Sequence, residues 1–312
     1  LYSYYNDGNV MSWVSMPVFH SAGRFEVKQG QLTSLGTVVF QPLLNVKERS
    51  FWNNNSSQKA YVTRLNDNID FKNFILSHYP NLATSIDFSK PLTWLEDDLN
   101  EYRENLGRLS RENAYGNTAS ELSSAGHGAI LARFGQVKIL TKAGEWVSID
   151  LPSNSQLSGV FESGDLVAIG SEKGVVYLGE SVAGEWREIY PVSAKEAIVW
   201  FARTPDINYV ITSAASNFFV YEFSSIEDEW QQVGKFKKKD RNDWLVQNGG
   251  LFAWIKENGE LRVLNDNKYF DYERASASWS QSKSTSMVNL KKLRSGVIVA
   301  LEVSQWDGVG DQ

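Results

Sequence analysis

Cysteine is absent from the 312 residues, which excludes disulfide bonds, a thiolate nucleophile and a cysteine-ligated zinc site. Histidine is scarce: His20, His78 and His127 lie far apart in the sequence and show neither H-x-H nor HExxH spacing. Histidine ligands of metals commonly occur at such spacings. The sequence therefore predicts no metal site and no cofactor.

Long hydrophobic runs are missing as well. The longest β-rich segments, such as GVIVALEV, are far shorter than the ~18 apolar residues of a membrane-spanning helix, so we expect no transmembrane segment. The formal net charge of −6 argues against general nucleic-acid binding, because phosphate contacts call for a basic surface. Proline occurs only 7 times, whereas tryptophan occurs 11 times. This composition favours β-sheets that pack through aromatic side chains.

A short motif, Ala-Gly-Glu-Trp, recurs along the chain. It is found in KAGEWVSIDLP and in VAGEWREIYPV, where it ends at Trp146 and Trp186. Weaker relatives contain Trp230, Trp279 and Trp13, and the intervals from Trp146 to Trp279 are 40 to 49 residues. Such a period indicates a repeated structural unit.

Each repeat divides into four short strands. In the clearest one, LSGVFE, DLVAIG, GVVYLG and EWREIY are separated by sequences typical of antiparallel turns, and AIVWFAR, INYVITS, NFFVYEF and EWQQVG follow in the next. A period of about 40 to 50 residues built of four strands is typical of a β-propeller blade. We predict an all-β fold, a single β-propeller domain over residues 1–312 with seven or six four-stranded blades.

The two ends of the chain each carry half a blade. MVNLKKL and GVIVAL match the first two strands of a blade, and LYSYY and SWVSM match the last two. We therefore predict that residues 1–17 complete the last blade with residues 287–312. Closure into a ring is expected to stabilise sheets that cannot bury both faces alone.

The segment between Trp13 and Trp146 leaves room for about three blades but is irregular. The stretch LTWLEDDLNEYRENLGRLSRE has apolar residues at helical spacing. These are Leu95, Leu99, Tyr102, Leu106 and Leu109. Thr93 with Glu96 forms a capping-box pattern. We predict one amphipathic helix at about Trp94–Ser110, in an insertion of residues 92–112, whose apolar stripe packs on the propeller or, alternatively, meets a partner helix.

The turn of the form Gly-x-Trp before the outer strand resembles a degenerate Asp-box, or BNR, repeat of the sialidase superfamily, and also the propellers of photosystem II assembly factors. Both motif copies keep the Gly and Trp but lack the Asp of that box. FARTP, residues Phe201 to Pro205, resembles the superfamily's Phe/Tyr-Arg-Ile-Pro motif with an inserted Ala. The resemblance implies a propeller, whereas the scattered arginines show no substrate-binding triad for sialidase activity.

Strand order predicts a difference in charge between the two faces of the propeller. The turns between second and third strands, together with the links between blades, share one face, and we expect a basic surface there. Its candidate binding residues are Lys173, Lys195, Lys235, Lys237, Lys238, Lys239, Arg241 and Lys256. The Gly-Glu-Trp turns make the opposite face acidic. A basic face raises the encounter rate with an acidic partner or a polyanion.

Without a catalytic constellation, the sequence favours a non-enzymatic scaffold or recognition module for protein assembly or ligand binding. We expect it to bind a protein partner, acidic or polyanionic, and to act outside the cytoplasm, at a cell envelope or in a virion. The alternative is a glycan-binding or sialidase- or glycosidase-like propeller, with Trp200 and Trp244 as sugar platforms.

Overall fold

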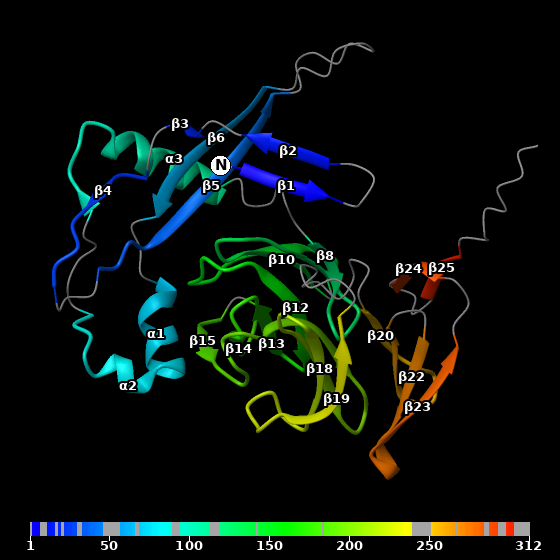
Figure 1. Ribbon diagram of the computed structural model, residues 1–312. Coiled ribbons are helices and arrows are strands. Elements are labelled where there is room, and N and C mark those ends of the chain that lie inside the picture. The colour runs from blue at the N-terminus through cyan, green and yellow to red at the C-terminus, as the bar shows by residue number, and fades with distance from the viewer. Residues whose placement is uncertain are drawn as a thin grey trace, which may run out of the picture. The chain divides into compact units, whose positions relative to one another are not determined.

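The computed structural model describes most of the chain (Figure 1). The described residues are 2–6, 11–15, 18–19, 22–29, 33–45, 57–65, 69–88, 94–112, 119–141, 143–182, 184–238, 251–265, 268–283, 287–292 and 298–302. The chain divides into two compact units, residues 1–114 and residues 115–312. A single domain over all 312 residues stays a prediction.

The second unit contains four consecutive four-stranded antiparallel sheets whose strands pair in chain order. Sheet 1 consists of β8 (Ala119–Leu122), β9 (Gly128–Leu131), β10 (Gln136–Leu140) and β11 (Trp146–Asp150). Sheet 2 consists of β12 (Leu157–Ser163), β13 (Leu166–Ser171), β14 (Val176–Gly179) and β15 (Trp186–Ile189). Sheet 3 consists of β16 (Ala197–Arg203), β17 (Asn208–Ser213), β18 (Asn217–Phe223) and β19 (Gln231–Lys237). Sheet 4 consists of β20 (Leu251–Ile255), β21 (Leu261–Asn265), β22 (Lys268–Glu273) and β23 (Ser278–Lys283), with a 3-10 turn, Arg274–Ser276, before β23.

The strands of sheets 2 and 3 are those that the sequence defines most clearly, and the prediction of four-stranded antiparallel units is confirmed for them. Tight turns join the strands. Gly164 and Gly174 have positive φ angles of 67° and 72° in two of these turns, a backbone conformation that glycine adopts without a steric penalty. The turn sequences noted above therefore mark the strand boundaries correctly in sheet 2.

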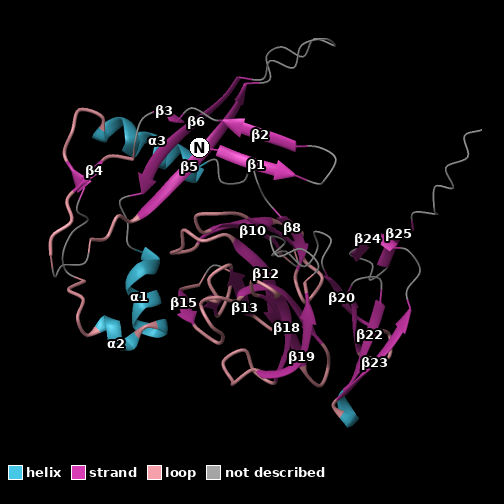
Figure 2. Ribbon diagram, viewed as in Figure 1, coloured by secondary structure: helices cyan, strands magenta, loops and turns pink. Residues whose placement is uncertain are grey.

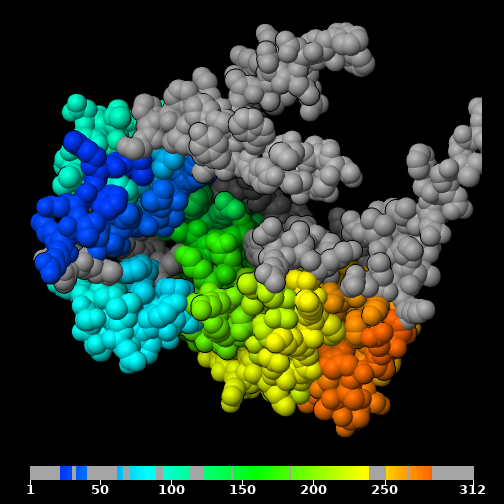
Figure 3. Space-filling model, in the orientation of Figure 1, coloured from blue at the N-terminus to red at the C-terminus, as the bar shows by residue number. Residues whose placement is uncertain are grey.

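Successive sheets pack against one another through three hydrophobic clusters. The first contains Tyr177 and joins sheets 1 and 2. The second joins sheets 2 and 3 through Phe161 and Phe201, whose ring centroids are 5.8 Å apart. The third joins sheets 3 and 4 through Val220 and Val263. Figure 3 shows the surfaces of sheets 3 and 4 adjoining each other, in yellow and orange.

Burial differs between the inner and outer sheets of this series. Nearly every residue of β12 and β13 in sheet 2 is buried. In β9 and β10 of sheet 1, buried and half-buried residues alternate. A sheet that is covered on both faces buries successive residues, whereas a sheet covered on one face alternates. Sheet 2 is thus an interior layer, and sheet 1 has one less covered face.

Three repeat tryptophans pack at the interface with the preceding sheet. Trp230, directly before β19, is 7% exposed and stacks on Phe223 at 5.3 Å within the cluster shared with sheet 2. Trp279 of sheet 4 donates its Nε1–H to the Val233 carbonyl of sheet 3 at 2.6 Å. Trp186 packs against the cluster shared with sheet 1. The motif thus marks the contact between one sheet and the sheet before it.

Trp146 differs from these three, because its side chain is 51% exposed. It lies in sheet 1, and no four-stranded sheet precedes sheet 1 in the described part of the second unit. Trp146 therefore does not share the packed position between sheets that the other three tryptophans occupy. Trp13 lies in a strand, β2, but its side chain is outside the described residues.

The strands expected at the two ends of the chain form hairpins. β1 (Tyr2–Asn6) pairs with β2 (Met11–Ser15), and β24 (Met287–Lys292) pairs with β25 (Ile298–Glu302), both antiparallel. These are the two half-blades of the prediction. The pairing of one hairpin with the other stays a prediction.

The first unit differs from the expected blades. β5 (Thr37–Asn45) and β6 (Ser57–Leu65) pair antiparallel, and β3 (Val18–Phe19) joins β6 in parallel. β4 (Arg24–Phe25) pairs with β7 (Trp94–Leu95). Within its described residues this unit has no four-stranded sheet. It also carries helices α1 (Ile69–His78) and α2 (Pro80–Ala83), which were not predicted (Figure 2).

A helix is present in the predicted insertion, but it begins later than expected. α3 spans Asn100–Glu112, whereas Trp94 lies in β7. The Trp94 indole donates a hydrogen bond to the Leu35 carbonyl at 3.0 Å, and the Arg64 guanidinium lies 4.5 Å from its ring centroid. These contacts hold Trp94 in an extended segment, and Asp97 begins the turn that leads into the helix, accepting a hydrogen bond from the Leu99 amide at 2.9 Å.

The predicted apolar stripe of this helix does not form its buried face. Its members Leu99, Tyr102 and Leu109 are exposed, whereas the buried residues are Arg103, Gly107 and Ser110. A Cβ atom on Gly107 would lie 2.5 Å from the carbonyl oxygen of residue 64, so the helix approaches β6 too closely for a larger side chain. Thr63 of β6 also donates a hydrogen bond to the carbonyl of residue 103 at 2.5 Å. In the part of the chain that the structure describes, no helix is long and apolar enough to span a membrane.

The tryptophan contacts predict a contrast between two substitutions. Trp230→Ala is expected to lower the free energy of unfolding by about 3–5 kcal/mol, because it opens a cavity between sheets 2 and 3. Trp146→Ala, at the equivalent position of sheet 1, should cost less than about 1 kcal/mol, because half of that side chain is already exposed. Urea unfolding of the two variants measures the difference. Equal losses would contradict the role assigned to the motif.

Candidate functional site

Each sheet of the second unit has two distinct ends. Because paired strands run antiparallel in chain order, the turn between the second and third strands lies at the same end as the connections to neighbouring sheets. We call this the link end. The two other turns, which join first to second and third to fourth strands, form the hairpin end.

Contacts between sheets 3 and 4 show that like ends meet. At the link end, the Asn265 amide, at the end of β21, donates to the carbonyl of Lys237, at the end of β19, at 3.3 Å. At the hairpin end, Arg274 Nε is 3.5 Å from Glu222 Oε2. The link ends of these neighbouring sheets therefore form a continuous surface.

Several predicted cations lie at the link end. Lys173 is in the β13–β14 turn, and Lys195 is in the connection from sheet 2 to sheet 3. Lys237 ends β19, Lys238 follows it, and Lys235 lies two residues earlier with its Nζ 5.5 Å from the Phe219 ring centroid. Lys239 and Arg241 fall outside the described residues.

The prediction that Lys256 lies on the same face as the other cations is wrong. It follows β20 and belongs to the turn between the first and second strands of sheet 4, which lies at the hairpin end. There its Nζ is 2.6 Å from Glu260 Oε2 and 3.7 Å from Asp271 Oδ2. The prediction grouped Lys256 with the turns between second and third strands, whereas that turn of sheet 4 joins β21 to β22, after Asn265.

The link end also carries Arg133, in the β9–β10 turn, a cation that the sequence did not single out. Lys268 and Lys283 pair at the same end, where β22 begins and β23 ends. The described acidic residues at this end are Asp150, Glu172, Glu188 and Glu196, and each accepts a hydrogen bond from the protein. If the strand boundaries of sheets 1 and 4 had been assigned correctly from the sequence, Arg133 and Lys268 would have been placed at this end.

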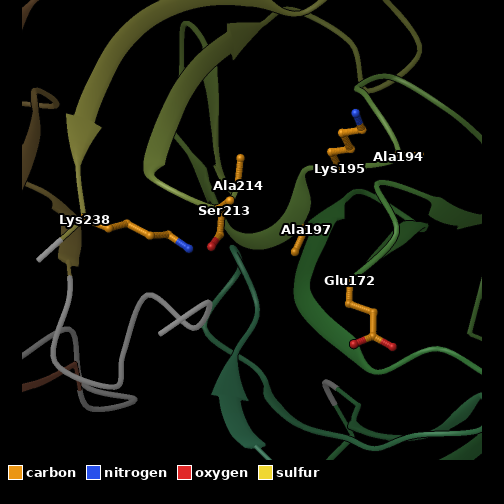
Figure 4. Close-up of a pocket in the computed structure, with 8 residues that line it drawn as sticks. Glu172, Ala194, Lys195, Ala197, Ser213, Ala214 and Lys238 are labelled. Carbon is orange, nitrogen blue, oxygen red and sulfur yellow. The ribbon is translucent and has the colours of Figure 1, made fainter. Parts of the chain in front are cut away.

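A pocket with a cavity volume of about 230 Å³ opens at the link end between sheets 2 and 3 (Figure 4). Its lining comes from the β13–β14 turn, the connection between the two sheets, the β17–β18 turn and the residue after β19. The lining residues are Glu172, Ala194, Lys195, Ala197, Ser213, Ala214, Ala215 and Lys238. Two of the predicted cations, Lys195 and Lys238, are thus brought to one cavity.

Lys238 is an unusual lysine because it is only 6% exposed. Its Nζ lies 4.9 Å from the ring centroid of Phe218, which is itself fully buried, and its backbone amide donates to the Ser216 carbonyl at 3.0 Å. An ammonium group over an aromatic face gains electrostatic attraction while its alkyl stem packs on the ring. The position of this charge in the pocket is therefore well defined.

Ser213, the last residue of β17, faces the same cavity. The residue is 3% exposed, and its buried Oγ has no hydrogen-bond partner among the described residues. Figure 4 shows its hydroxyl and the Lys238 ammonium pointing toward one another, whereas the Lys195 side chain points away from them. A buried hydroxyl without a partner costs about 1–3 kcal/mol. The pocket thus keeps one hydrogen-bonding group unsatisfied.

The acidic groups beside the pocket are engaged within the protein. Glu172 Oε1 accepts the Gln156 amide at 3.0 Å. Glu196 Oε2 accepts hydrogen bonds from Thr212 Oγ1 and from the Tyr221 hydroxyl, both at 2.8 Å. Burial raises the pKa of the Tyr221 hydroxyl, and its bond to the carboxylate raises that pKa further. Tyr221 therefore remains a donor to Glu196 at neutral pH.

The hairpin end is rich in acidic residues, and its charges form ion pairs. Arg262 binds Asp271 in a bidentate manner, with Nε–Oδ1 and Nη2–Oδ2 distances of 2.6 Å. This arginine, first, and then Lys256 hold the pKa of the Asp271 carboxyl below its usual range. His127, in the β8–β9 turn, places Nδ1 2.6 Å from Glu162 Oε2. Within the described ranges, no three potential metal ligands come together.

The glycan alternative has no support in the described geometry. Trp200 packs as a half-buried residue against the cluster between sheets 3 and 4. Trp244 lies outside the described residues. Arg203, from FARTP, ends β16 as an exposed residue at the hairpin end.

Comparison with known proteins identifies no family for this chain. No protein-family model matches the chain, and no curated protein matches it. Among solved structures, YCF48 from Cyanidioschyzon merolae is 16% identical with a TM-score of 0.38, over 56% of this chain and 59% of that chain. YCF48 bound to D1 peptide is 14% identical with a TM-score of 0.40, over 57% and 60%. The extracellular domain of the putative one-component system BT4673 from B. thetaiotaomicron is 10% identical with a TM-score of 0.38, over 57% and 26%.

The matches span about three fifths of the YCF48 chains and about a quarter of the third protein. The resemblance to an Asp box stays a prediction.

The Asp271 ion pair predicts a pH-dependent contribution to stability. Asp271→Asn is expected to lower the free energy of unfolding by about 1–2 kcal/mol at pH 7. The folded-state pKa lies below the ordinary value of about 3.9, so this contribution is present above that value and is lost as the pH falls through the folded-state pKa.

Denaturant unfolding of both proteins between pH 3 and pH 7 tests this difference. The control is Glu227→Gln, whose carboxylate pairs with Arg187 at 2.5 Å while both side chains are 53% exposed. That substitution should change stability by less than about 0.5 kcal/mol at any pH. A pH-independent difference for Asp271→Asn would contradict the assignment.

Proposed function

We propose that this chain is a non-enzymatic β-propeller that serves as a recognition platform for an acidic protein partner, with the link end of its sheets as the binding face. The observation that carries the proposal is the gathering of cations at that end. Lysines and arginine from all four sheets lie there, while each carboxylate that the structure describes at this end accepts a hydrogen bond within the protein. Complementary charge increases the association rate and selects against basic partners.

The chemistry of turns supports the same assignment. Residues at strand ends and in connections are free to vary, because the sheets are held by contacts between their faces. The link-end turns of sheets 2 and 3, SEKG and SAAS, differ in charge and size although their strands are equivalent. Such variation on a rigid support suits recognition of a specific surface.

The proposal includes closure of the ring, with seven or six blades, by residues 1–17 and 287–312. Sheet 1 leaves one face less covered and exposes Trp146, as expected for a blade whose neighbour lies elsewhere in the chain. In blade order, β25 would be the second strand and β1 the third, so these two would pair antiparallel.

The absence of native cysteine makes closure directly testable. We expect a cysteine at Ser3 to form a disulfide with a cysteine at one of Val299, Ala300 or Leu301 on oxidation. The crosslink should raise the free energy of unfolding by about 2–4 kcal/mol. A cysteine at Ser282 of β23 serves as the control for chance contact. No crosslink at any of the three positions, or an equal yield with the control, would reject the closure.

The binding face is tested by photo-crosslinking in the organism of origin. A photoreactive amino acid at Lys195, exposed at the link end, should capture the partner, whereas one at Arg203, exposed at the hairpin end, should not. The captured protein is then purified, and its affinity is measured against two matched charge reversals.

Lys195→Glu is expected to weaken binding about three- to tenfold at low salt, mainly through a slower association rate, and Arg203→Glu should leave binding unchanged. The loss should shrink as salt is added, because exposed charges are screened. Capture from Arg203 but not from Lys195, or equal effects of the two reversals, would disprove the assignment of the face.

A further inference from the structure

We propose that the pocket between sheets 2 and 3 binds a single carboxylate group of a peptide, supplied by an Asp or Glu side chain or by a C-terminus. The inference rests on the proposed function, because it names the group of the partner that enters the link end. It depends on Lys238, Ser213 and the small residues around them.

The first argument is the charge of the lining. Lys238 places its ammonium group in this cavity (Figure 4), and the carboxylate in the lining, that of Glu172, already accepts the Gln156 amide at 3.0 Å. An ammonium group forms its strongest hydrogen bonds with anionic oxygens, and carboxylates are the anions that an acidic protein supplies.

The second argument is the unsatisfied hydroxyl of Ser213. Ser213 is buried at the end of β17, and its Oγ has no partner among the described residues. Its O–H can donate to a carboxylate oxygen that also approaches Lys238, because the two side chains point toward one another in Figure 4. A hydrogen bond to a charged group is stronger than one between neutral groups, so a bound carboxylate offsets the cost of the unpaired hydroxyl.

The third argument is shape. Alanines 194, 197, 214 and 215 form the remaining walls, and a cavity volume of about 230 Å³ accepts a short acidic side chain. Small apolar walls reduce the access of water, which strengthens the attraction between the ammonium and the carboxylate. The buried lysine stem on Phe218 holds the cation in place before the ligand arrives, so little conformational entropy is lost on binding.

Three blocked tripeptides and inorganic phosphate are the probes for this site. Acetyl-Gly-Glu-Gly-amide presents a side-chain carboxylate, acetyl-Gly-Gly-Gly with a free C-terminus presents a terminal one, and acetyl-Gly-Gln-Gly-amide is the neutral isostere. Binding is followed by amide chemical shifts in NMR spectra of the isotope-labelled full chain. We expect saturable shifts at Ser213, Ala214 and Ala215 with one or both carboxylate peptides and none with the glutamine peptide.

Two substitutions separate binding from folding. Ser213→Ala should weaken carboxylate binding about tenfold while leaving stability unchanged or slightly higher, because it removes an unsatisfied hydroxyl. Ser155→Ala is the matched control: Ser155 is also buried with an Oγ that lacks a partner among the described residues, but it is not in the pocket lining. It should have the same effect on stability and none on binding. Lys238→Met, which keeps the stem on Phe218, should abolish the shifts.

The outcomes distinguish this inference from the proposed function. Equal shifts with the glutamine peptide, binding of phosphate alone, or no shift with any probe would overturn the carboxylate site. So would unchanged binding by Ser213→Ala. If the probes fail while Lys195→Glu still weakens the partner, only the pocket assignment is wrong. If the probes bind while the partner crosslinks from the hairpin end, the pocket stands and the proposed face is wrong.

Discussion

The contact between the faces of successive four-stranded sheets is the constraint on which the second unit depends. A four-stranded sheet of these short strands buries too little surface by itself, so each sheet must be covered by its neighbours. Sheet 2 meets this requirement on both sides, through the clusters that contain Tyr177 and Phe161, and nearly all residues of its first two strands are buried. Close approach is built into the sequence: a Cβ atom on Gly170 would lie 2.5 Å from Ile198 of sheet 3. By the same requirement, the less covered face of sheet 1 needs a neighbouring sheet, which closure of the ring would supply.

Large aromatic side chains supply much of this contact. The ring centroids of Phe161 in sheet 2 and Phe223 in sheet 3 are 5.5 Å apart. Trp230, directly before β19, stacks on the Phe223 ring. Gly234 lies at the interface between sheets 3 and 4, where a Cβ atom at this position would be 2.8 Å from the Trp279 side chain. Small residues therefore sit where the tryptophan of the next sheet packs. The repeat motif thus lies at contacts between sheets in three of its copies, whereas its exposed copy at Trp146 lies in sheet 1, the first sheet of this series.

Strands with regular alternation or continuous apolar character could be predicted from the sequence, because the turn residues between them mark where each strand begins and ends. The packing of elements that are far apart in the sequence could not be predicted. The helix of residues 100–112 buries Arg103 and Gly107 instead of its leucines, since its approach to β6 requires a residue without a side chain and Asp97 neutralises the arginine at 2.6 Å. The misplacement of Lys256 has a similar cause, because two adjacent turns in sheet 4 have comparable polar sequences. The pocket could not be predicted from the sequence, because Ser213 is uncharged and lies near Lys238 only through the pairing of strands in sheet 3, where Ser213 ends β17 and Lys238 follows β19.

The faces of the sheets hold the fold together, whereas the ends of the sheets carry the proposed binding residues. Substitutions at the ends can therefore change binding with little loss of stability. Residues of the faces fix the sheets, so substitutions there lower the free energy of unfolding by several kcal/mol. At the link end, Ser213 has a buried Oγ without a hydrogen-bond partner among the described residues, an arrangement that costs stability in the absence of a ligand. A buried hydroxyl without a partner is retained most readily where a ligand completes its hydrogen bond, since natural proteins depart from ideal packing chiefly at functional sites. The same reasoning separates Ser213 from Arg262 at the opposite end, whose donors already meet Asp271 and leave no such requirement.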